Sequence, residues 1–170
     1  MLRHVLVPLD GSNLSEQALP YAEAVVAKGG KITLVSVLEL PIDYEYAVMD
    51  IPLTIVSNQS YSEEQYDNTY RQVQDYLNLK ARELTKRGFD VTCVVETGDP
   101  AIVLTDIASR EKVNAIVITT HGRTGFSKWL FGSVTQKVIA SMPCPVFVVP
   151  GKEVVKSEDA QPVFRTAPAT

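Results

Sequence analysis

Short runs of β-branched and other apolar residues alternate with longer segments in which apolar residues recur at helical spacing. Five runs have the length and composition of buried strands. They span residues 4–9, 31–40, 90–97, 114–120 and 145–150. Four segments have the helical period: 14–28, which ends at a Gly-Gly pair, then 61–87, 100–111 and 132–142. Strands that are apolar on both faces and alternate with helices predict an α/β fold, a single doubly wound five-stranded parallel sheet with helices on both faces.

Capping residues stand at the ends of the helical segments. Asp10-Gly11-Ser12 follows the first strand and supplies capping chemistry for the helix that begins at 14. Asp99 is placed to cap the third helix, and Pro100 occupies its first position, where the missing N–H has no cost. The predicted inward faces are Leu14, Ala18, Tyr21, Ala22, Val25 and Val26 in the first helix, and Tyr66, Tyr70, Val73, Leu77, Ala81 and Leu84 in the second.

The chain of 170 residues has the length of one domain, which we place at residues 1–150. Residues 41–60 interrupt the alternation as an insertion loop of mixed character. We expect either a surface excursion whose tyrosines cover the sheet edge or, alternatively, a lid or a dimer contact. Residues 151–170 form a C-terminal tail rich in Pro, Ala and Thr, a composition typical of disorder.

Composition narrows the classes of partner. The 16 basic and 20 acidic residues give a formal net charge of −4, which argues against a nucleic-acid groove or an anionic membrane surface. No segment reaches the roughly 18 uninterrupted apolar residues of a transmembrane helix. The two cysteines, Cys93 and Cys144, have neither metal-binding nor CxxC spacing, and we interpret them as buried thiols of a cytoplasmic protein.

The stretch ITTHGRTGFSKWLFGSVTQKV (118–138) holds the strongest candidate for binding chemistry. It follows the fourth predicted strand, and ligands of open parallel sheets bind outside the carboxyl ends of the strands. Gly122 allows a ligand to approach the backbone closely, and Gly132-Ser133-Val134 opens a helix whose first N–H groups lack intrahelical acceptors. With charge from Arg123, these groups predict an anion cradle suited to phosphate. The plainer alternative is that the glycines only form turns and Ser133 only caps the helix.

Three segments together resemble the universal stress protein family. They are VLVPLDGSNLSEQALPYA at the N-terminus, TGDPAIVLTDIA in the middle and THGRTGFSKWLFGSVTQKVIASMPCPVFVVP near the C-terminus. The resemblance covers 1–150 apart from the insertion at 41–60. Nucleotide-binding members of that family carry G-x2-G-x9-G-[ST]. Gly122, Gly132 and Ser133 match this pattern, whereas Thr119 stands in place of its first glycine.

The resemblance implies a three-layer sandwich of the adenine-nucleotide-hydrolase type that binds ATP, with Mg²⁺ or Mn²⁺ as an optional companion. It also implies a homodimer formed through the strand 145–149. Carried over residue by residue, Pro8, Leu9 and Asp10 would border adenine and ribose, and Val37 would pack on the adenine. Ile118 and Thr119 would line the floor of the site, and Gly122, Gly132, Ser133 and Val134 would hold the phosphates. The Thr119 side chain would either take some of the ligand's space or hydrogen-bond the ribose or a phosphate.

The function we expect is that of an ATP-binding stress-response regulator or sensor. The chain lacks a Walker P-loop, a GxGxxG fingerprint, a GxSxG elbow and an HExxH pair. Phosphoryl transfer needs metal ligands and a positioned nucleophile, and Asp10, which could bind a metal through water, could equally cap the first helix. We therefore expect at most slow ATP hydrolysis. The alternatives are a dimeric signalling module that does not bind nucleotide, or a slow ATPase.

Overall fold

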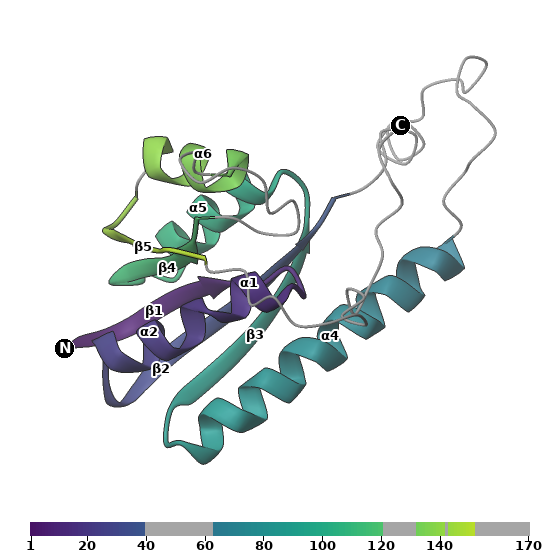
Figure 1. The fold of residues 1–170 in the computed structure, drawn as a ribbon. Coiled ribbons are helices and arrows are strands. Elements are labelled where there is room, and N and C mark those ends of the chain that lie inside the picture. Colours follow the sequence, from purple (N-terminus) through teal and green to yellow (C-terminus); the bar gives the residue numbers. More distant parts are fainter. Residues whose placement is uncertain (40–62, 121–131, 142, 152–170) are drawn as a thin grey trace.

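A computed structural model describes residues 1–39, 63–120, 132–141 and 143–151, and its centre is a five-stranded parallel sheet (Figure 1). The strands are β1 (Leu2–Pro8), β2 (Val26–Leu38), β3 (Asp90–Thr97), β4 (Ala115–Thr119) and β5 (Val146–Val149), in the spatial order β3-β2-β1-β4-β5. The helices are α1 (Asn13–Glu16), α2 (Ala18–Val25), α4 (Glu63–Lys86), α5 (Pro100–Arg110) and α6 (Ser133–Ser141). The predicted α/β fold with a doubly wound parallel sheet is confirmed. The predicted insertion (41–60) lies outside the described residues, as does the predicted tail (151–170) apart from Gly151.

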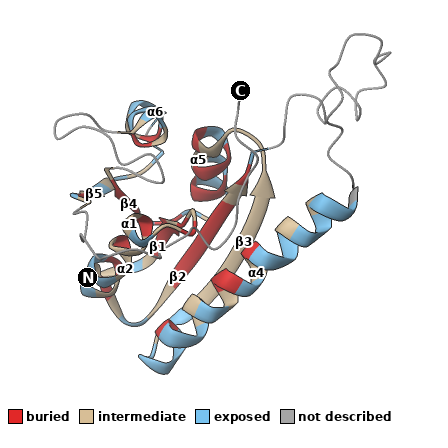
Figure 2. Cartoon of the chain, turned by 45° about the vertical axis from the view of Figure 1, so that its right-hand side comes forward, coloured by how far each residue is buried: buried red, intermediate tan, exposed pale blue. Residues whose placement is uncertain are grey.

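The sheet separates two apolar cores, which makes the domain three layers thick. One core lies under α2 and α4 and contains Val5, Val7, Leu34, Val73, Leu77 and Val117. The other lies under α5 and α6 and contains Leu6, Val35, Leu104, Ile107, Ile116 and Val138. Figure 2 shows the buried residues along β2 and on the inner side of α5, with exposed residues along the outer side of α4. Successive residues of each strand alternate between the two cores, as the pleat of a strand requires.

The predicted cap of α5 is confirmed. The Asp99 carboxylate accepts hydrogen bonds from the amides of Ala101 (2.8 Å) and Ile102 (3.2 Å), and Pro100 stands at the start of the helix. The second oxygen of the carboxylate accepts from Nζ of Lys137 in α6 at 2.8 Å. These bonds, the one from Lys137 first, hold the pKa of Asp99 below its ordinary value. The cap therefore also joins α5 to α6.

The first predicted helix, 14–28, is wrong in two respects. It is interrupted at Gln17, and it ends at Val25 because the chain enters β2 at Val26, which pairs with Leu2 of β1. A register shift follows, since the next pair is His4 with Lys31, and Gly29 takes a φ of 75° within the shifted segment. Backbone pairing with β1 therefore wins over helical periodicity. Tyr21, predicted to face inward, is 54% exposed.

The long helix α4 agrees with the prediction of 61–87. Val73, Leu77 and Leu84 are buried as expected, but Tyr70 is 37% exposed. Tyr76, which was not on the predicted face, is buried because α1 lies beside it: its hydroxyl donates to Oε1 of Glu16 at 3.0 Å. Burial and the Glu16 carboxylate raise the pKa of Tyr76 far above its ordinary value. No helix in the described part of the chain is long and apolar enough to cross a membrane.

Cys93 and Cys144, which were predicted to be buried thiols, are only partly buried. Cys93 faces the core under α2 and α4, and Cys144 packs against the core under α5 and α6. Burial still raises the pKa of both thiols above its ordinary value. Both groups therefore favour the neutral thiol over the reactive thiolate.

The end of α5 carries a lysine in the left-handed region. Lys112 has a φ of 51°, and its N–H donates to the carbonyl of Ser109 (3.2 Å) while Val113 N–H donates to that of Ala108 (3.1 Å). This is a Schellman ending, in which glycine normally occupies the left-handed position. We expect Lys112→Gly to raise the free energy of unfolding by about 0.5–1 kcal/mol, because relief of the backbone strain exceeds the extra entropy of glycine. Urea denaturation measures the change. Lys112→Ala removes the same charge but keeps the strain, so an equal gain in that variant would contradict the explanation.

Candidate functional site

The sheet topology places a candidate site between β1 and β4. From β1 the chain builds β2 and β3 on one side, and it later crosses over to build β4 and β5 on the other. The ladder between β1 and β4 runs only through Val5–Ala115 and Leu6–Ile116. Connections from these two neighbouring strands therefore leave in opposite directions at the carboxyl edge of the sheet, the usual ligand position in open α/β sheets.

The end of β1 is fastened to β2 at this edge. Pro8 pairs with Val35, and the N–H of Leu9 donates to the Val35 carbonyl at 2.8 Å. The hydroxyl of Ser36 donates to the Leu9 carbonyl at 2.6 Å. The Leu9 side chain is 2% exposed and belongs to the core under α2 and α4. Leu9 therefore fixes the position of the next residue, Asp10. The N–H, carbonyl and side chain of Leu9 are themselves used in hydrogen bonds to β2 and in core packing.

Asp10 is held by a closed set of hydrogen bonds with two serines. Its Oδ1 accepts from the amide (2.9 Å) and the hydroxyl (2.6 Å) of Ser12. Ser12 is the N-cap of α1 and accepts from the amide of Ser15 at 3.1 Å. The buried Ser15 hydroxyl accepts from the Asp10 amide (3.3 Å) and donates to the Ser12 carbonyl (2.9 Å). The side-chain cap of α1 is therefore Ser12, and Asp10 orients Ser12.

The start of α6 is bonded to the end of β4. Gly132 N–H donates to the Thr120 carbonyl at 2.7 Å, and Thr135 Oγ1 donates to the Thr119 carbonyl at 3.0 Å. The following residue, Ser133, is exposed and Val134 is partly buried. The first N–H groups of a helix have no intrahelical acceptor and carry the positive end of its dipole. The two bonds hold this end of α6 next to the carboxyl end of β4.

Thr119 itself is 5% exposed. Ile116 and Ile118 belong to the core under α5 and α6, whereas Val117 belongs to the core under α2 and α4. Because side chains alternate along a strand, Thr119 lies on the α2 side of the sheet with Val117. Its side chain therefore packs on the face opposite α6, although its carbonyl bonds to Thr135 of that helix.

The structure brings most of the predicted site residues to one edge of the sheet. Pro8, Leu9, Asp10, Val37, Ile118, Thr119, Gly132, Ser133 and Val134 all lie at the carboxyl ends of β1, β2 and β4 or at the start of α6. Val37 lies two positions beyond Val35, the partner of Pro8, which puts it level with Asp10 on the neighbouring strand. Gly122 and Arg123 lie outside the described residues.

Three residues that organise this edge were missed by sequence reasoning, Ser15, Thr120 and Thr135, and Ser12 was predicted only as part of the capping segment Asp10-Gly11-Ser12. Each acts through a hydrogen bond that depends on local geometry or on the meeting of distant segments. For Ser12 and Ser15, the spacing S-x-x-S at a predicted helix start is a usable signal, since serines there bond to backbone amides. For Thr120 and Thr135, the sequence offers no equivalent signal.

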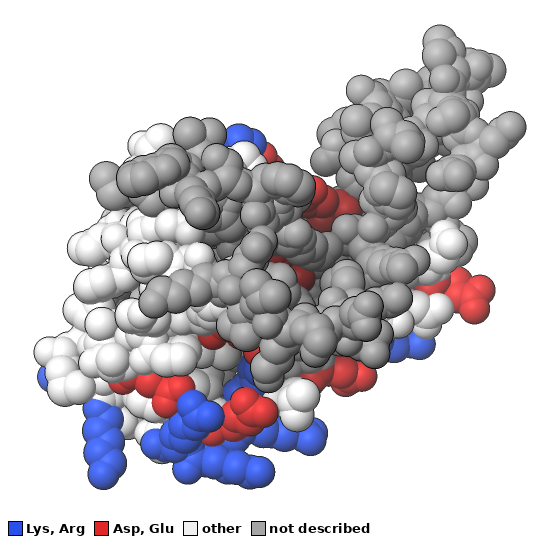
Figure 3. All heavy atoms as spheres, viewed as in Figure 1, with Lys and Arg blue, Asp and Glu red and all other residues white. Residues whose placement is uncertain are grey.

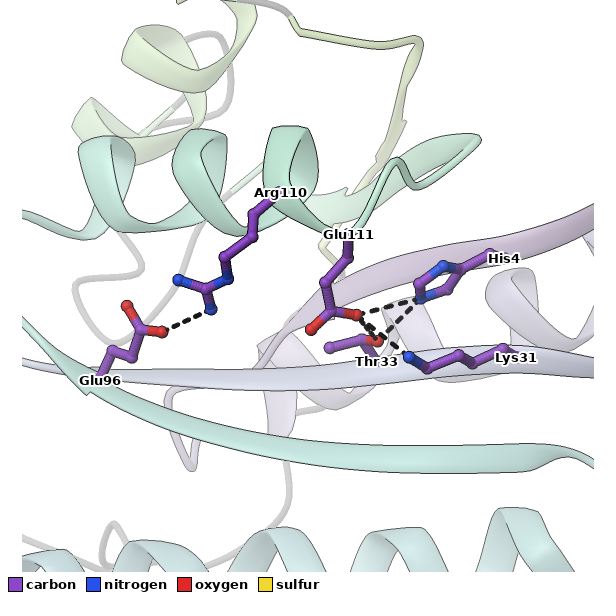
Figure 4. A network of polar contacts seen from close by, with 6 residues as sticks. All are labelled: His4, Lys31, Thr33, Glu96, Arg110 and Glu111. Atoms are coloured by element: carbon purple, nitrogen blue, oxygen red, sulfur yellow. Dashed lines mark hydrogen bonds and ion pairs between the residues drawn. The ribbon is translucent and has the colours of Figure 1, made fainter.

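A polar cluster lies at the opposite, amino edge of the sheet (Figure 4). Thr33 Oγ1 donates to Oε2 of Glu111 at 2.9 Å, so its single proton is committed, and Nε2 of His4 donates to Thr33 Oγ1 at 2.9 Å. Lys31 Nζ lies 3.3 Å from the same Glu111 oxygen. Burial alone would raise the pKa of Glu111, but the bonds from Thr33 and Lys31 outweigh it and hold that pKa below its ordinary value. Burial first, and then the Lys31 charge, hold the pKa of His4 below 6.5, against the opposing carboxylates of Glu111 and Asp90.

This cluster predicts a loss of stability in mild acid. As the pH falls below 6.5, His4 takes up a proton in the unfolded chain before it does so in the folded one, so the free energy of unfolding decreases. Above 6.5 the stabilisation is fully present. We expect His4→Gln to lose less stability than wild type between about pH 7.5 and pH 5.5, measured by urea denaturation. Equal pH dependence of the two proteins would show that another group is responsible. Glu111, with its lowered pKa, stays charged throughout this window.

In the view of Figure 3, the basic side chains that can be seen lie mostly along the lower side of the molecule, where Figure 1 has the turn between α2 and β2 and the end of α4. Lys28, Lys86 and Arg87 are exposed there, and Arg87 bonds to Glu23 of α2 at 2.6 Å. Within the described part of the chain, the backbone N–H groups at the start of α6 contribute positive potential at the carboxyl edge.

The fold and this edge define a doubly wound α/β domain whose strand-to-helix connections converge at a single switch point. The model of the universal stress protein family matches residues 1–150. The chain belongs to the universal stress protein family. A putative universal stress protein of Staphylococcus haemolyticus is 30% identical over 167 residues, which cover 96% of this chain and 93% of that protein.

Similarity extends to solved structures. A universal stress protein of Methanocaldococcus jannaschii is 29% identical over 160 residues, covering 89% of this chain and 97% of that protein. Its solved structure aligns with a TM-score of 0.74 at 26% identity, over 90% of this chain and 99% of that chain. Two more distant structures share the fold. One is a universal stress protein in complex with cAMP, which is 18% identical and aligns with a TM-score of 0.58 over 88% of this chain and 97% of that chain. The other is a universal stress protein family protein of Arabidopsis thaliana with AMP bound, which is 15% identical and aligns with a TM-score of 0.57 over 88% of this chain and 92% of that chain.

Proposed function

We propose that this protein binds ATP at the carboxyl edge of its sheet and acts as a homodimeric regulator or sensor in the stress response of the cytoplasm. The observation that carries the proposal is the attachment of the α6 N-terminus to the end of β4. That attachment presents outward-pointing amides at the switch point, next to the Asp10 turn, and such amides bind phosphate. The cAMP- and AMP-bound relatives support an adenine nucleotide as the ligand class.

The described residues fit the nucleotide with one change to the predicted roles. Gly132 already donates its N–H to Thr120, so its part is to leave room for a phosphate, while the amides of Ser133 and Val134 and the Ser133 hydroxyl donate. The buried Thr119 side chain lies on the other face of the sheet from α6, which favours binding despite the missing motif glycine. Arg123 and Gly122 would complete the phosphate site. Val37 offers an apolar contact for the base.

Regulation, rather than efficient turnover, is the activity that these residues favour. Asp10 Oδ1 already accepts two hydrogen bonds from Ser12, which suits an orienting role toward ribose hydroxyls or a metal-bound water. Among the described residues, no group of three or more His, Cys, Asp or Glu side chains could hold a metal ion. Bound ATP would supply the signal, and hydrolysis would at most be slow.

The homodimer is proposed through β5. Within the described residues, β4 is the only strand paired with β5, so its other edge offers backbone groups for pairing. Phe147 on this edge strand is 42% exposed, between the partly buried Val146 and Val148. An apolar edge without a blocking charge is a template for a second copy of the same strand.

The test of the proposal is titration calorimetry of the full chain with Mg-ATP, together with mass spectrometry of nucleotide extracted from freshly purified protein. We expect binding in the micromolar range and an adenine nucleotide in the extract. Absence of heat at millimolar Mg-ATP would overturn the proposal and favour a dimeric signalling module without nucleotide. Accumulation of ADP that stops in Asp10→Ala would instead favour the slow ATPase.

A further inference from the structure

Thr120, the residue that follows β4, joins three segments of the chain. Its N–H donates to the carbonyl of Val149 at the end of β5 (2.9 Å). Its carbonyl accepts from Gly132 at the start of α6 (2.7 Å). Its Oγ1 accepts from the N–H of Gly151 at 3.1 Å. One residue therefore connects the proposed phosphate-binding turn to the end of the edge strand and to the residue from which 152–170 continue.

Gly151 is closely surrounded at this junction. A Cβ placed on it would lie 3.2 Å from Cδ2 of Leu14 and 3.7 Å from Oγ1 of Thr120. Leu14 belongs to α1, the helix that is capped by Ser12, and Ser12 is in turn oriented by Asp10. Gly151 thus lies between the β1 side and the β4 side of the proposed site. A change in the position of Thr120 would be transmitted to Gly151 directly.

We propose that Thr120 is a positioning residue that couples nucleotide binding at the start of α6 to order at the end of β5 and at Gly151. This inference rests on the proposed function. An anion held by the first amides of α6 stabilises the conformations in which that turn is formed, and the Gly132–Thr120 bond then holds Thr120 in place. Thr120 in turn holds Val149 and Gly151. Because such coupling is reciprocal, whatever stabilises β5, including a second copy of the strand, strengthens nucleotide binding.

Of the three hydrogen bonds of Thr120 named above, only the bond to its side-chain Oγ1 can be removed by substitution. Thr120→Val keeps the shape and both backbone bonds but deletes the acceptor for Gly151. Thr120→Ser keeps the hydroxyl and is the matched control. A hydrogen bond of this kind is worth about a factor of five in an equilibrium constant, so its loss is measurable in a local opening equilibrium.

The experiment is amide hydrogen exchange of the full-length chain, followed by NMR with and without saturating Mg-ATP, with affinities from calorimetry. In wild type we expect Mg-ATP to slow exchange of the Gly151 amide at least about fivefold, the lower end of usual coupling. Thr120→Val should bind Mg-ATP with an affinity within about threefold of wild type but lose most of the slowing at Gly151. Thr120→Ser should recover it. Exchange at Leu77 in α4 reports overall stability, and its change is subtracted to separate global unfolding from local opening at Gly151.

Full slowing at Gly151 in Thr120→Val, or its loss in Thr120→Ser as well, would overturn the coupling while leaving nucleotide binding intact. If wild type fails to bind Mg-ATP, the proposed function falls, and the coupling is judged from the ligand-free proteins. Thr120→Val should then speed exchange both at Gly151 and at Gln136, whose amide donates to Gly132 at 2.9 Å in the first turn of α6. An unchanged rate at Gln136 would overturn it.

Discussion

Gly132→Val is expected to abolish nucleotide binding, weakening the affinity for Mg-ATP by at least about 100-fold. The branched side chain would stand at the residue that precedes Ser133 and Val134, and it would prevent close approach of a phosphate to their amides. Two charge-assisted hydrogen bonds at about 1.5–3 kcal/mol each account for a loss of that size. Calorimetry with Mg-ATP gives the affinity, and circular dichroism and thermal denaturation report whether the fold persists.

The substitution also has a structural cost that must be separated from the loss of binding. Valine is a poor residue at the N-cap position, so α6 should lose about 1 kcal/mol of stability. Ser141→Val is the matched control because it introduces the same side chain at an exposed position at the other end of α6. That variant should bind Mg-ATP like wild type. If Gly132→Val binds as tightly as Ser141→Val, the phosphates do not bind at the start of α6.

Phe147→Glu is expected to convert the proposed dimer into a monomer, raising its dissociation constant by about 100-fold or more. Phe147 is a large aromatic side chain on the edge strand, and aromatic anchors of this kind dominate the energy of interfaces. Two copies of β5 side by side would also bring two glutamates into one apolar contact, where an unpaired charge is costly. Sedimentation velocity over a range of concentrations measures the change.

The control for this variant uses another exposed apolar residue. Ile102 in the first turn of α5 is 62% exposed, and Ile102→Glu adds the same charge far from β5 in sequence. It should leave the oligomeric state unchanged. A wild-type protein that sediments as a monomer at every concentration would refute the homodimer, and a Phe147→Glu dimer would refute its placement at β5.

The sequence predicted the strands and the α5 cap because both depend on local chemistry. Asp99-Pro100 specifies a helix start on its own, and the β-branched run at 90–97 coincides with β3. The end of the first helix could not be obtained in this way, since Val25 and Val26 fit a helix period equally well. Only the pairing of Val26 with Leu2, remote in sequence, makes that segment a strand.

The candidate site was also predicted only in part, for the same reason. Gly132 and Ser133 were predicted at a helix start, and the structure places them there, whereas their contact with ligand stays a prediction. The roles of Thr120 and Thr135 depend on the meeting of β4, β5 and α6, which no residue pattern expresses. Thr119 shows the limit most clearly. Its identity suggested either a loss of space for the ligand or a hydrogen bond to it, and the structure adds that its side chain is buried on the sheet face away from α6.

The ladder between β1 and β4 has a mechanical consequence. It contains two residue pairs, whereas β1 and β2 are joined by six pairs and β2 and β3 by eight. Proteins open in contiguous cooperative units, and the boundary between units falls where few bonds cross. In partial unfolding we expect the two sides of the sheet to separate along this ladder, with loss of the bonds from Asn114 to Arg3 and His4 and of the Lys137–Asp99 bond between α6 and α5. This ladder lies where the ligand is proposed to bind. A bound ligand that contacts both the β1 side and the β4 side would therefore oppose their separation.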